Sequence, residues 1–230
     1  MLVKNLQYVQ ERVVKACERV GRVPSEVTLI AVSKTKPIDM LETVYKNGIR
    51  HFGENKVQEM CKKMEVLPND IHWHMIGHLQ TNKVKYIVGQ TTLIHSVDSY
   101  KLAEEIQKQA VKKGVDVDIL VEVNIAQEES KFGIRKEDTI ELVRAIAKLD
   151  RVHIKGLMTI APYVENPEDN RPFFRGIKDL SVDIKSQNID NVSMDMLSMG
   201  MSGDYEVAIE EGATFVRVGT GIFGERNYNI

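Results

Sequence analysis

Two lysines stand two positions apart at the end of an apolar run, in the segment AVSKTKP (31–37). A lysine amine becomes a nucleophile when its pKa is lowered by a partly dry pocket and a neighbouring cation. Side chains alternate along a strand, so Lys34 continues the inward face of this run, whereas Lys36 precedes Pro37, where the chain should leave the strand. Lys34 is therefore the candidate nucleophile. The alternative is that Lys34 is a solvated charge, the usual situation of lysine.

Small and hydroxyl-bearing residues end two later apolar runs, in LSMGMSG (197–203) and RVGTGIFG (217–224). Glycines let backbone N–H groups approach an anion closely, and Ser202 and Thr220 add hydroxyl donors. A helix predicted to begin after Ser202 is expected to turn its N-terminal partial charge toward the same anion. These features predict a phosphate site. The alternative is that Ser202 only caps the helix and the glycines only turn the chain.

The elements that must position these residues alternate regularly along the chain. The strand candidates are 27–33, 49–53, 71–77, 92–97, 117–125, 152–160, 193–200 and 214–220. The helix candidates between them are 37–47, 56–66, 82–88, 99–113, 136–149, 167–187 and 204–211. An amphipathic helix over residues 1–21 precedes them and ends at Gly21.

Strands that alternate with helices indicate a parallel sheet with right-handed crossovers. Eight such units in 230 residues predict an α/β protein, a (β/α)8 TIM barrel with an extra N-terminal helix. An open doubly wound sheet is the alternative. The chain has no composition break, so we expect one domain over residues 1–230, with the barrel spanning residues 27–226.

Chemistry in such barrels takes place where the strands end at their carboxyl side. Lys34 ends the first strand and Arg217 lies on the eighth, which is its neighbour in a closed barrel. Arg217 is thus a candidate for the cation that lowers the pKa of Lys34. A lysine that faces a phosphate site suggests pyridoxal 5′-phosphate (PLP), a flat ring with an aldehyde and a phosphate on opposite sides.

Composition and charge exclude several other classes of protein. The 31 basic and 33 acidic residues nearly cancel, so no bulk field attracts nucleic acid or an anionic membrane. Only Cys17 and Cys61 are present, without metal-type spacing, which favours a reducing compartment. There is no signal-peptide core and no apolar run of membrane-spanning length, so we expect a soluble cytoplasmic protein.

The segment HWHMIGH (72–78) offers a competing interpretation, because two histidines separated by one residue can bind a metal. In barrel metalloenzymes such a pair closes the first strand, whereas here it lies within the third. No matching carboxylates follow, so packed or capping histidines are the preferred explanation and no metal is expected.

The motifs, taken together, resemble a known family. In order along the chain, from Val27 to Arg226, they are AVSKTKP, HFGENKVQE, WHMIGHLQTNK, EESKFGI, IKGLMTI and LSMGMSGDYEVAIEEGATFVRVGTGIFGER. They closely resemble the pyridoxal phosphate homeostasis proteins. That family is similar in fold to the N-terminal barrel of alanine racemase and of other fold-type III PLP enzymes.

The resemblance implies roles for the residues that bind the cofactor. It places the PLP Schiff base on Lys34, in AVSK, rather than on Lys36. It places the phosphate near Ser202, in LSMGMS, and near Gly219 and Thr220, in RVGT.

Other positions surround the cofactor's ring. The resemblance places Arg217 near the pyridine nitrogen, and Asn55 and Met199 in the wall of the ring pocket. Because arginine cannot accept a proton, the nitrogen should stay neutral and stabilise a carbanion weakly. Phe132 departs from the family pattern, in which a smaller residue follows the lysine, so no role is assigned to the loop around Lys131.

The implied function is intracellular PLP homeostasis, in which the protein holds PLP and supplies or buffers it. The expected partners are PLP and apo forms of PLP-dependent enzymes, and the expected state is a monomer or weak dimer. The alternative is a PLP-dependent amino-acid racemase. A non-catalytic carrier is preferred because the chain ends at Ile230 without the added β-domain of racemases.

Overall fold

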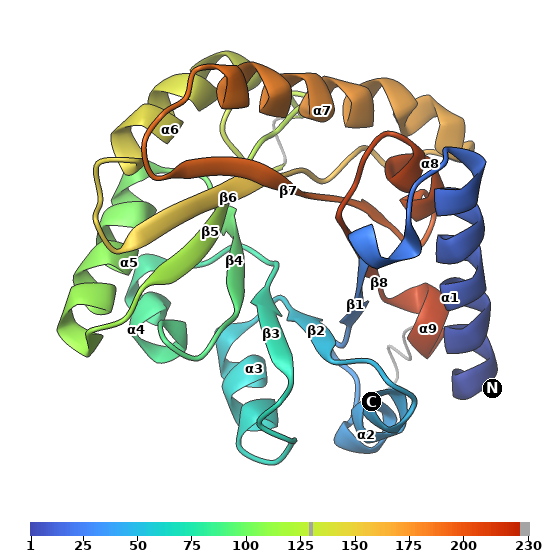
Figure 1. Cartoon of the computed structure of the whole chain (residues 1–230). Helices are drawn as coiled ribbons and strands as arrows, with labels where there is room; N and C mark the ends of the chain where they lie inside the picture. Colours follow the sequence, from blue (N-terminus) through green and yellow to red (C-terminus); the bar gives the residue numbers. More distant parts are fainter. Residues whose placement is uncertain (129–130, 226–230) are drawn as a thin grey trace.

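The computed structural model describes residues 1–128 and 131–225. Residues 129–130, in the EESKFGI segment, and 226–230, which include the expected end of the barrel, lie outside the described part. The strands are β1 (Thr28–Val32), β2 (His51–Glu54), β3 (His72–Met75), β4 (Leu93–Val97), β5 (Val117–Glu122), β6 (Val152–Met158), β7 (Val192–Met201) and β8 (Phe215–Val218). They form a closed parallel barrel in chain order, because β8 pairs with β1 (Figure 1). The predicted barrel is confirmed, and the open sheet is excluded.

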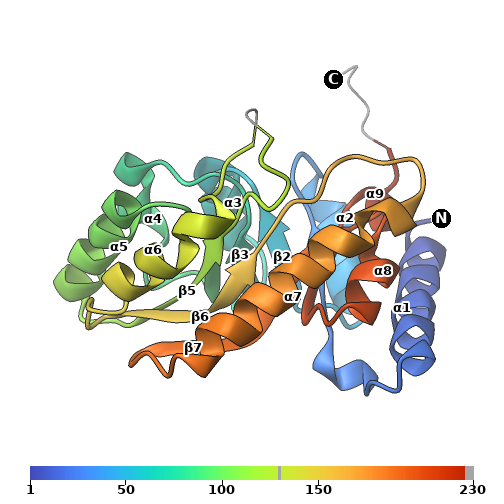
Figure 2. The same ribbon diagram turned by 90° about the horizontal axis from the view of Figure 1, so that it is seen from above.

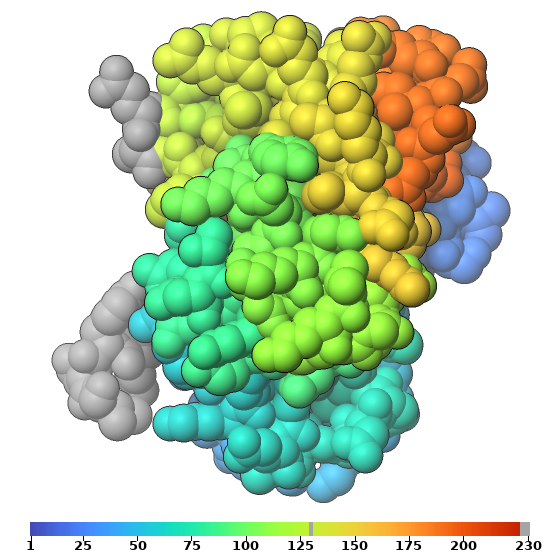
Figure 3. All heavy atoms as spheres, turned by 90° about the vertical axis from the view of Figure 1, so that its left-hand side faces the viewer, coloured from blue at the N-terminus to red at the C-terminus, as the bar shows by residue number. Residues whose placement is uncertain are grey.

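Helices surround the barrel. The α-helices are α1 (Leu2–Arg19), α2 (Ile38–Lys46), α3 (Val57–Met64), α4 (Val84–Ile87), α5 (Tyr100–Lys113), α6 (Thr139–Ile146), α7 (Arg171–Ser186), α8 (Tyr205–Glu210) and α9 (Thr220–Phe223). Short 3-10 turns are η1 (Pro24–Glu26), η2 (Thr81–Lys83), η3 (Lys136–Asp138) and η4 (Pro167–Asn170). The space-filling view from the left-hand side of Figure 1 shows an outer face formed largely by the green and yellow segments of the chain, which include α5 and α6 (Figure 3). In residues 1–128 and 131–225, no helix has the length and apolar character needed to cross a membrane.

The helix α9 was not expected from the sequence, which predicted a strand over 214–220. The strand ends at Val218, and the chain then turns outward. Ser202 holds this turn, because its hydroxyl oxygen accepts the backbone N–H groups of Gly219 and Gly221, each at 3.2 Å. The same contact builds part of the site described below.

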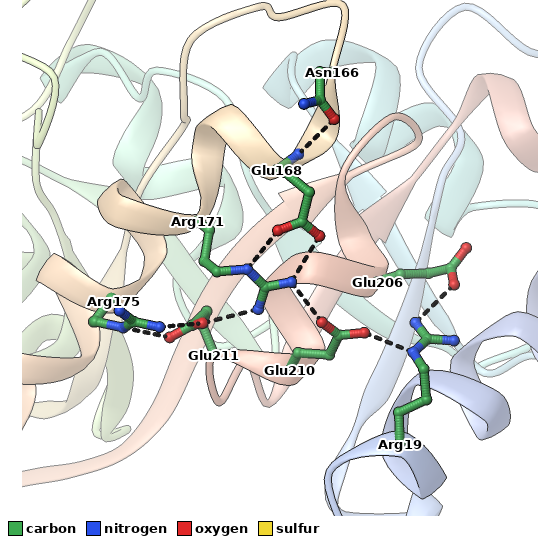
Figure 4. A network of polar contacts seen from close by, with 8 residues as sticks. All are labelled: Arg19, Asn166, Glu168, Arg171, Arg175, Glu206, Glu210 and Glu211. Atoms are coloured by element: carbon green, nitrogen blue, oxygen red, sulfur yellow. Dashed lines mark hydrogen bonds and ion pairs between the residues drawn. The ribbon is translucent and has the colours of Figure 1, made fainter.

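The extra N-terminal helix packs against α8 and α9, close to where the chain leaves β8 (Figures 1 and 2). A network of ion pairs fastens it there (Figure 4). Arg19 bonds Glu206 at 2.9 Å and Glu210 at 2.6 Å, and Arg171 of α7 bonds Glu210 at 2.7 Å and Glu211 at 2.9 Å. Since Glu206 and Glu210 lie on α8 and Glu211 directly follows it, this short helix is held between α1 and α7.

Apolar side chains fill two regions. The larger cluster lies between the strands and the surrounding helices. The smaller cluster, inside the barrel, consists of Ile30, Leu93, Leu120, Met158 and Phe215. Ile30 shares its strand face with Val32, and the turn that holds Lys34 follows directly after the end of β1.

Candidate cofactor site

A cavity of about 570 Å³ opens at the carboxyl ends of the strands. Its wall contains the predicted site residues Lys34, Asn55, Ser202, Arg217, Gly219 and Thr220. These residues come from both ends of the chain. The closure of the barrel brings them together, since β8 pairs with β1 and β1 with β2.

Met199 is the exception among the predicted site residues. Its side chain is fully buried in the apolar cluster outside the barrel and is not part of the cavity wall. Side chains alternate along β7, so Ser198 faces the barrel interior and Met199 faces the helices. The methionine of this motif that lines the cavity is Met201, which follows the bend at Gly200 (φ +89°).

Lys34 projects into the cavity from a tight turn. The backbone N–H of Lys36 donates to the carbonyl of Ser33 at 3.0 Å, and Thr35 has a φ of 61°. A β-branched residue rarely adopts this left-handed conformation, which stores strain of about 1–3 kcal/mol. Lys36 points elsewhere: its Nζ donates to backbone carbonyls at the end of α9, at 3.1–3.4 Å. The structure thus separates the two lysines through a turn that follows β1, rather than through the alternation of the strand itself.

A buried ion cluster lies directly beneath this turn. The Nζ of Lys63, on α3, is 2.7 Å from the Ser33 carbonyl and from one carboxylate oxygen of each of Glu54 and Glu59. Glu59 also accepts the backbone N–H of Thr35 at 2.6 Å. Burial raises the pKa of Glu54, while Lys63 acts in the opposite direction. Both peptide groups that flank Lys34 are therefore tied to one cluster.

The predicted phosphate site is a loop of donors around Ser202. Because the Ser202 oxygen accepts two backbone N–H groups, its hydroxyl proton is directed to another acceptor. A Cβ at position 221 would lie 2.9 Å from a methyl group of Val218, so the loop requires glycine there. Asp204 precedes α8 and accepts the N–H of Met201 at 2.7 Å. Because the Asp204 carboxylate at the start of α8 repels an anion, we expect the hydrogen-bond donors to a phosphate to come from the loop around Ser202 rather than from the N-terminus of α8.

Arg217 supplies a buried cation at the cavity. Its guanidinium donates to the hydroxyl of Ser198 at 2.6 Å and to the carbonyl of Thr159 at 2.8 Å. Both partners are neutral. Burial lowers the pKa of Arg217 to about 10, and the more distant carboxylates of Glu122 and Asp204 counteract this. The side chain remains protonated at neutral pH and can donate to a ligand atom.

Asn55 provides an observation that a ligand would explain. Its side-chain oxygen is buried and has no hydrogen-bond partner in the described part of the chain. Buried polar atoms are nearly always paired, so an orphaned one in a cavity wall is typical of a ligand-binding position. Gly77 allows this placement, because a Cβ there would lie 2.7 Å from the Asn55 backbone.

The sequence did not identify several residues of the cavity wall. They follow β5 and β6, whose connections rise on the same side of the barrel (Figure 2), and include Lys131, Ile160, Ala161, Pro162, Tyr163, Val164 and Asn170. These residues lie in irregular segments without a repeating pattern. In residues 1–128 and 131–225, no group of three or more His, Cys, Asp or Glu side chains is arranged so that it could hold a metal ion.

Comparison with known proteins agrees with this geometry. The family model for the N-terminal domain of alanine racemase matches residues 5–227. A pyridoxal phosphate homeostasis protein of Aquifex aeolicus (strain VF5) is 50% identical over 226 residues, which cover 98% of each chain. The structure of PipY from Synechococcus elongatus PCC7942 with PLP bound is 34% identical, with a TM-score of 0.80 over 92% of this chain and 100% of that chain.

Alanine racemase from Clostridium difficile 630 shares the fold alone, at 12% identity and a TM-score of 0.76, over 98% of this chain and 58% of its own. The barrel is thus common to both groups, whereas sequence identity over the full length is found with the homeostasis proteins. The chain belongs to the family of pyridoxal phosphate homeostasis proteins.

Proposed function

We propose that this protein binds PLP in the cavity and acts in PLP homeostasis, holding the cofactor and supplying or buffering it. One observation carries the proposal: a single cavity is lined by the amine of Lys34, the guanidinium of Arg217 and the donor loop around Ser202. PLP offers an aldehyde, a ring nitrogen and a phosphate to these three kinds of group. The orphaned oxygen of Asn55 supports a ligand at this place.

Each residue has a distinct task in this proposal. Lys34 supplies the amine that binds the aldehyde covalently, and its turn presents that amine to the cavity. Ser202 and Thr220 donate hydrogen bonds to the phosphate, and Gly219, whose N–H is bonded to Ser202, shapes the loop that receives it. Arg217 donates to the ring nitrogen and keeps it unprotonated, since a guanidinium cannot give up its own proton at neutral pH. The cofactor itself supplies an electrophilic aldehyde and a conjugated ring.

We further propose that the chain is one PLP-binding domain that works in the cytoplasm, as a monomer or weak dimer. Its partners are PLP and apo forms of PLP-dependent enzymes. A covalent but reversible bond suits a carrier, because the amine of a receiving enzyme can exchange for that of Lys34.

The first experiment tests the covalent bond. Protein incubated with PLP should turn yellow, and borohydride reduction followed by peptide mass mapping should locate the pyridoxyl group on Lys34. The Lys34→Ala variant should lose the colour and the adduct. Lys36→Ala is the matched control and should keep both, because Lys36 is bonded to the carbonyls after α9. An adduct on Lys36 in the wild-type protein would contradict the assignment.

The second experiment tests the phosphate site. Hydrogen bonds to a charged group contribute about 1.5–3 kcal/mol, so Ser202→Ala should weaken PLP binding about tenfold or more. Pyridoxal, which lacks the phosphate, should bind far more weakly than PLP, and Ser202→Ala should leave its affinity nearly unchanged. Titration by visible absorbance measures all four affinities. Equal affinity for the two aldehydes would show that the glycine loop only turns the chain.

A further inference from the structure

The interior of the barrel contains a continuous chain of polar side chains that ends at Arg217. His51 Nδ1 lies 2.9 Å from His74 Nε2, and His74 Nδ1 lies 2.9 Å from His95 Nε2. His95 Nδ1 lies 2.8 Å from the Ser198 hydroxyl, which accepts from Arg217 at 2.6 Å. The members come from β2, β3, β4, β7 and β8. The chain therefore crosses the barrel from the amino end of β2 to the wall of the cavity.

These residues depart from the usual filling of such a barrel, which is aliphatic. His74, His95 and Ser198 are almost completely buried, and the ring of Phe215 packs against both histidines at 5.7 and 5.9 Å between centroids. Burying polar groups costs free energy unless each is hydrogen-bonded. Where a sequence violates a packing rule in this way, a functional reason is expected.

The histidines in the chain are neutral. Burial lowers the pKa of His74 to about 3 and that of His51 to about 4, and it also lowers the pKa of His95. The charged or titratable groups that face them are each other, His72 beside His51 and His74, and Arg217 beside His95. A neutral imidazole donates one hydrogen bond and accepts one. Along this series of side chains, every hydrogen bond must therefore run from donor to acceptor in the same direction.

The contacts of Ser198 determine the donor-to-acceptor direction of these hydrogen bonds. Arg217 has only donors, so the Ser198 oxygen accepts from it, and the hydroxyl proton needs an acceptor of its own. In the described part of the chain, the other hydrogen-bond partner of this hydroxyl is His95 Nδ1. Ser198 thus donates to His95, His95 to His74, and His74 to His51. Both buried histidines, His74 and His95, carry their proton on Nε2.

We propose that Ser198, His95, His74 and His51 are positioning residues that hold the Arg217 guanidinium toward the cofactor's ring through this one-directional chain. The inference rests on the proposed function, in which Arg217 contacts the ring nitrogen. Successive hydrogen bonds polarise one another, so Ser198 is a stronger acceptor for Arg217 than an isolated hydroxyl. The chain thereby fixes the cation without a carboxylate at hydrogen-bonding distance, which would weaken its bond to a ligand.

The direction of the chain can be tested in the protein without PLP. Two-bond ¹H–¹⁵N correlation spectra of protein labelled with ¹⁵N-histidine distinguish the two neutral tautomers. His74 and His95 should both be Nε2–H, and Ser198→Ala should disturb their signals because His95 Nδ1 loses its donor. Nδ1–H tautomers at these two residues would overturn the proposed direction and with it the argument for Ser198.

Matched variants test whether the Ser198 hydroxyl affects the binding of PLP. Ser198→Ala should weaken PLP binding at least about tenfold, the factor for one hydrogen bond to a charged group, and should shift the visible absorption of bound PLP. Ser198→Thr should restore affinity by keeping the hydroxyl. Ser96→Ala is the control, because that hydroxyl is equally buried but has no hydrogen-bond partner in the described residues.

Thermal unfolding of each variant separates a binding defect from loss of the fold. Unchanged affinity and spectrum in a folded Ser198→Ala protein would overturn the positioning role. If Ser198→Ala does not fold, His95→Gln, which keeps one donor and one acceptor, takes its place under the same criteria. Absence of PLP binding in the wild-type protein would overturn the proposed function, and with it the role of the hydrogen-bonded side chains in positioning Arg217 toward the cofactor's ring. The histidine tautomers would still show the direction of the hydrogen bonds.

Discussion

Replacing Lys63 by methionine is expected to lower the free energy of unfolding by about 3–5 kcal/mol, the usual cost of removing one partner of a buried ion pair. The Lys63 side chain is 5% exposed and that of Glu54 is 0% exposed, at 2.7 Å from each other. Without Lys63, the side-chain hydrogen bond left to Glu54 among residues 1–128 and 131–225 is the one that Ser33 donates, at 2.5 Å. One of its oxygens is already buried without a partner in the described residues.

The loss should depend on pH in a definite direction. Glu54 in the variant is expected to take up a proton, and keeping a carboxyl of ordinary pKa protonated at pH 7 costs about 3–4 kcal/mol. If the pKa of Glu54 is higher in the folded variant than in the unfolded chain, the folded state is destabilised at every pH above the unfolded pKa. The loss of unfolding free energy in the variant should therefore become smaller as the pH falls from 7 to 5. Over these two pH units the reduction is about 2–3 kcal/mol.

Urea unfolding at pH 7 and pH 5 measures both effects. Lys62→Met is the matched control, since Lys62 is the exposed neighbour on α3, and it should change stability by less than about 0.5 kcal/mol. Adding Glu54→Gln to Lys63→Met should recover much of the loss, because no charge is then buried alone. A loss that is equal at both pH values, or that Glu54→Gln does not reduce, would contradict this account of the cluster.

The same cluster illustrates why part of the site could not be predicted. The barrel follows from a pattern that repeats along the chain, and the place of Lys34 follows from its position just after the first strand. Lys63, in contrast, occupies a helix in which neighbouring lysines are exposed, and nothing local distinguishes it from them. Glu54 reaches the Lys34 turn through the pairing of β1 with β2, and Glu59 reaches it when α3 packs against β2.

The register of the strands explains two other differences between the sequence prediction and the structure. The prediction for Met199 treated all residues of the LSMGMS motif as facing the cofactor. Neighbouring residues of β7 face opposite sides of the sheet, so Ser198 faces the barrel interior and Met199 faces the surrounding helices. The histidine chain was missed for the opposite reason. His51, His74 and His95 are separated by about twenty residues each, and only the parallel pairing of β2, β3 and β4 aligns them. Of the three, only His74 lies in HWHMIGH, the segment for which metal binding was weighed against packing or capping.

The proposal of a non-catalytic role is argued from the groups around Lys34. Racemisation needs one group to take a proton from the substrate and another to return a proton on the opposite face. Besides Lys34, the described protonable groups of the cavity wall are Lys131, Tyr163, Asp204 and Arg217. The Lys131 amine is bonded to a carboxylate and to backbone carbonyls, and both oxygens of Asp204 accept hydrogen bonds. Tyr163 is 96% exposed, and Arg217 cannot act as a base.

No second base is therefore held in place among the described residues, and an arginine beside the ring nitrogen, as proposed for Arg217, would disfavour carbanion formation. We expect the protein loaded with PLP to racemise common amino acids far more slowly than the range typical of enzymes, on the order of 1 s⁻¹ or faster. Chiral chromatography of the amino acids after incubation measures this rate, with Lys34→Ala as the control for cofactor-dependent activity. The same preparation should restore activity to an apo form of a PLP-dependent enzyme. Racemisation at an enzymatic rate that Lys34→Ala abolishes would instead identify the protein as a racemase and overturn the carrier role.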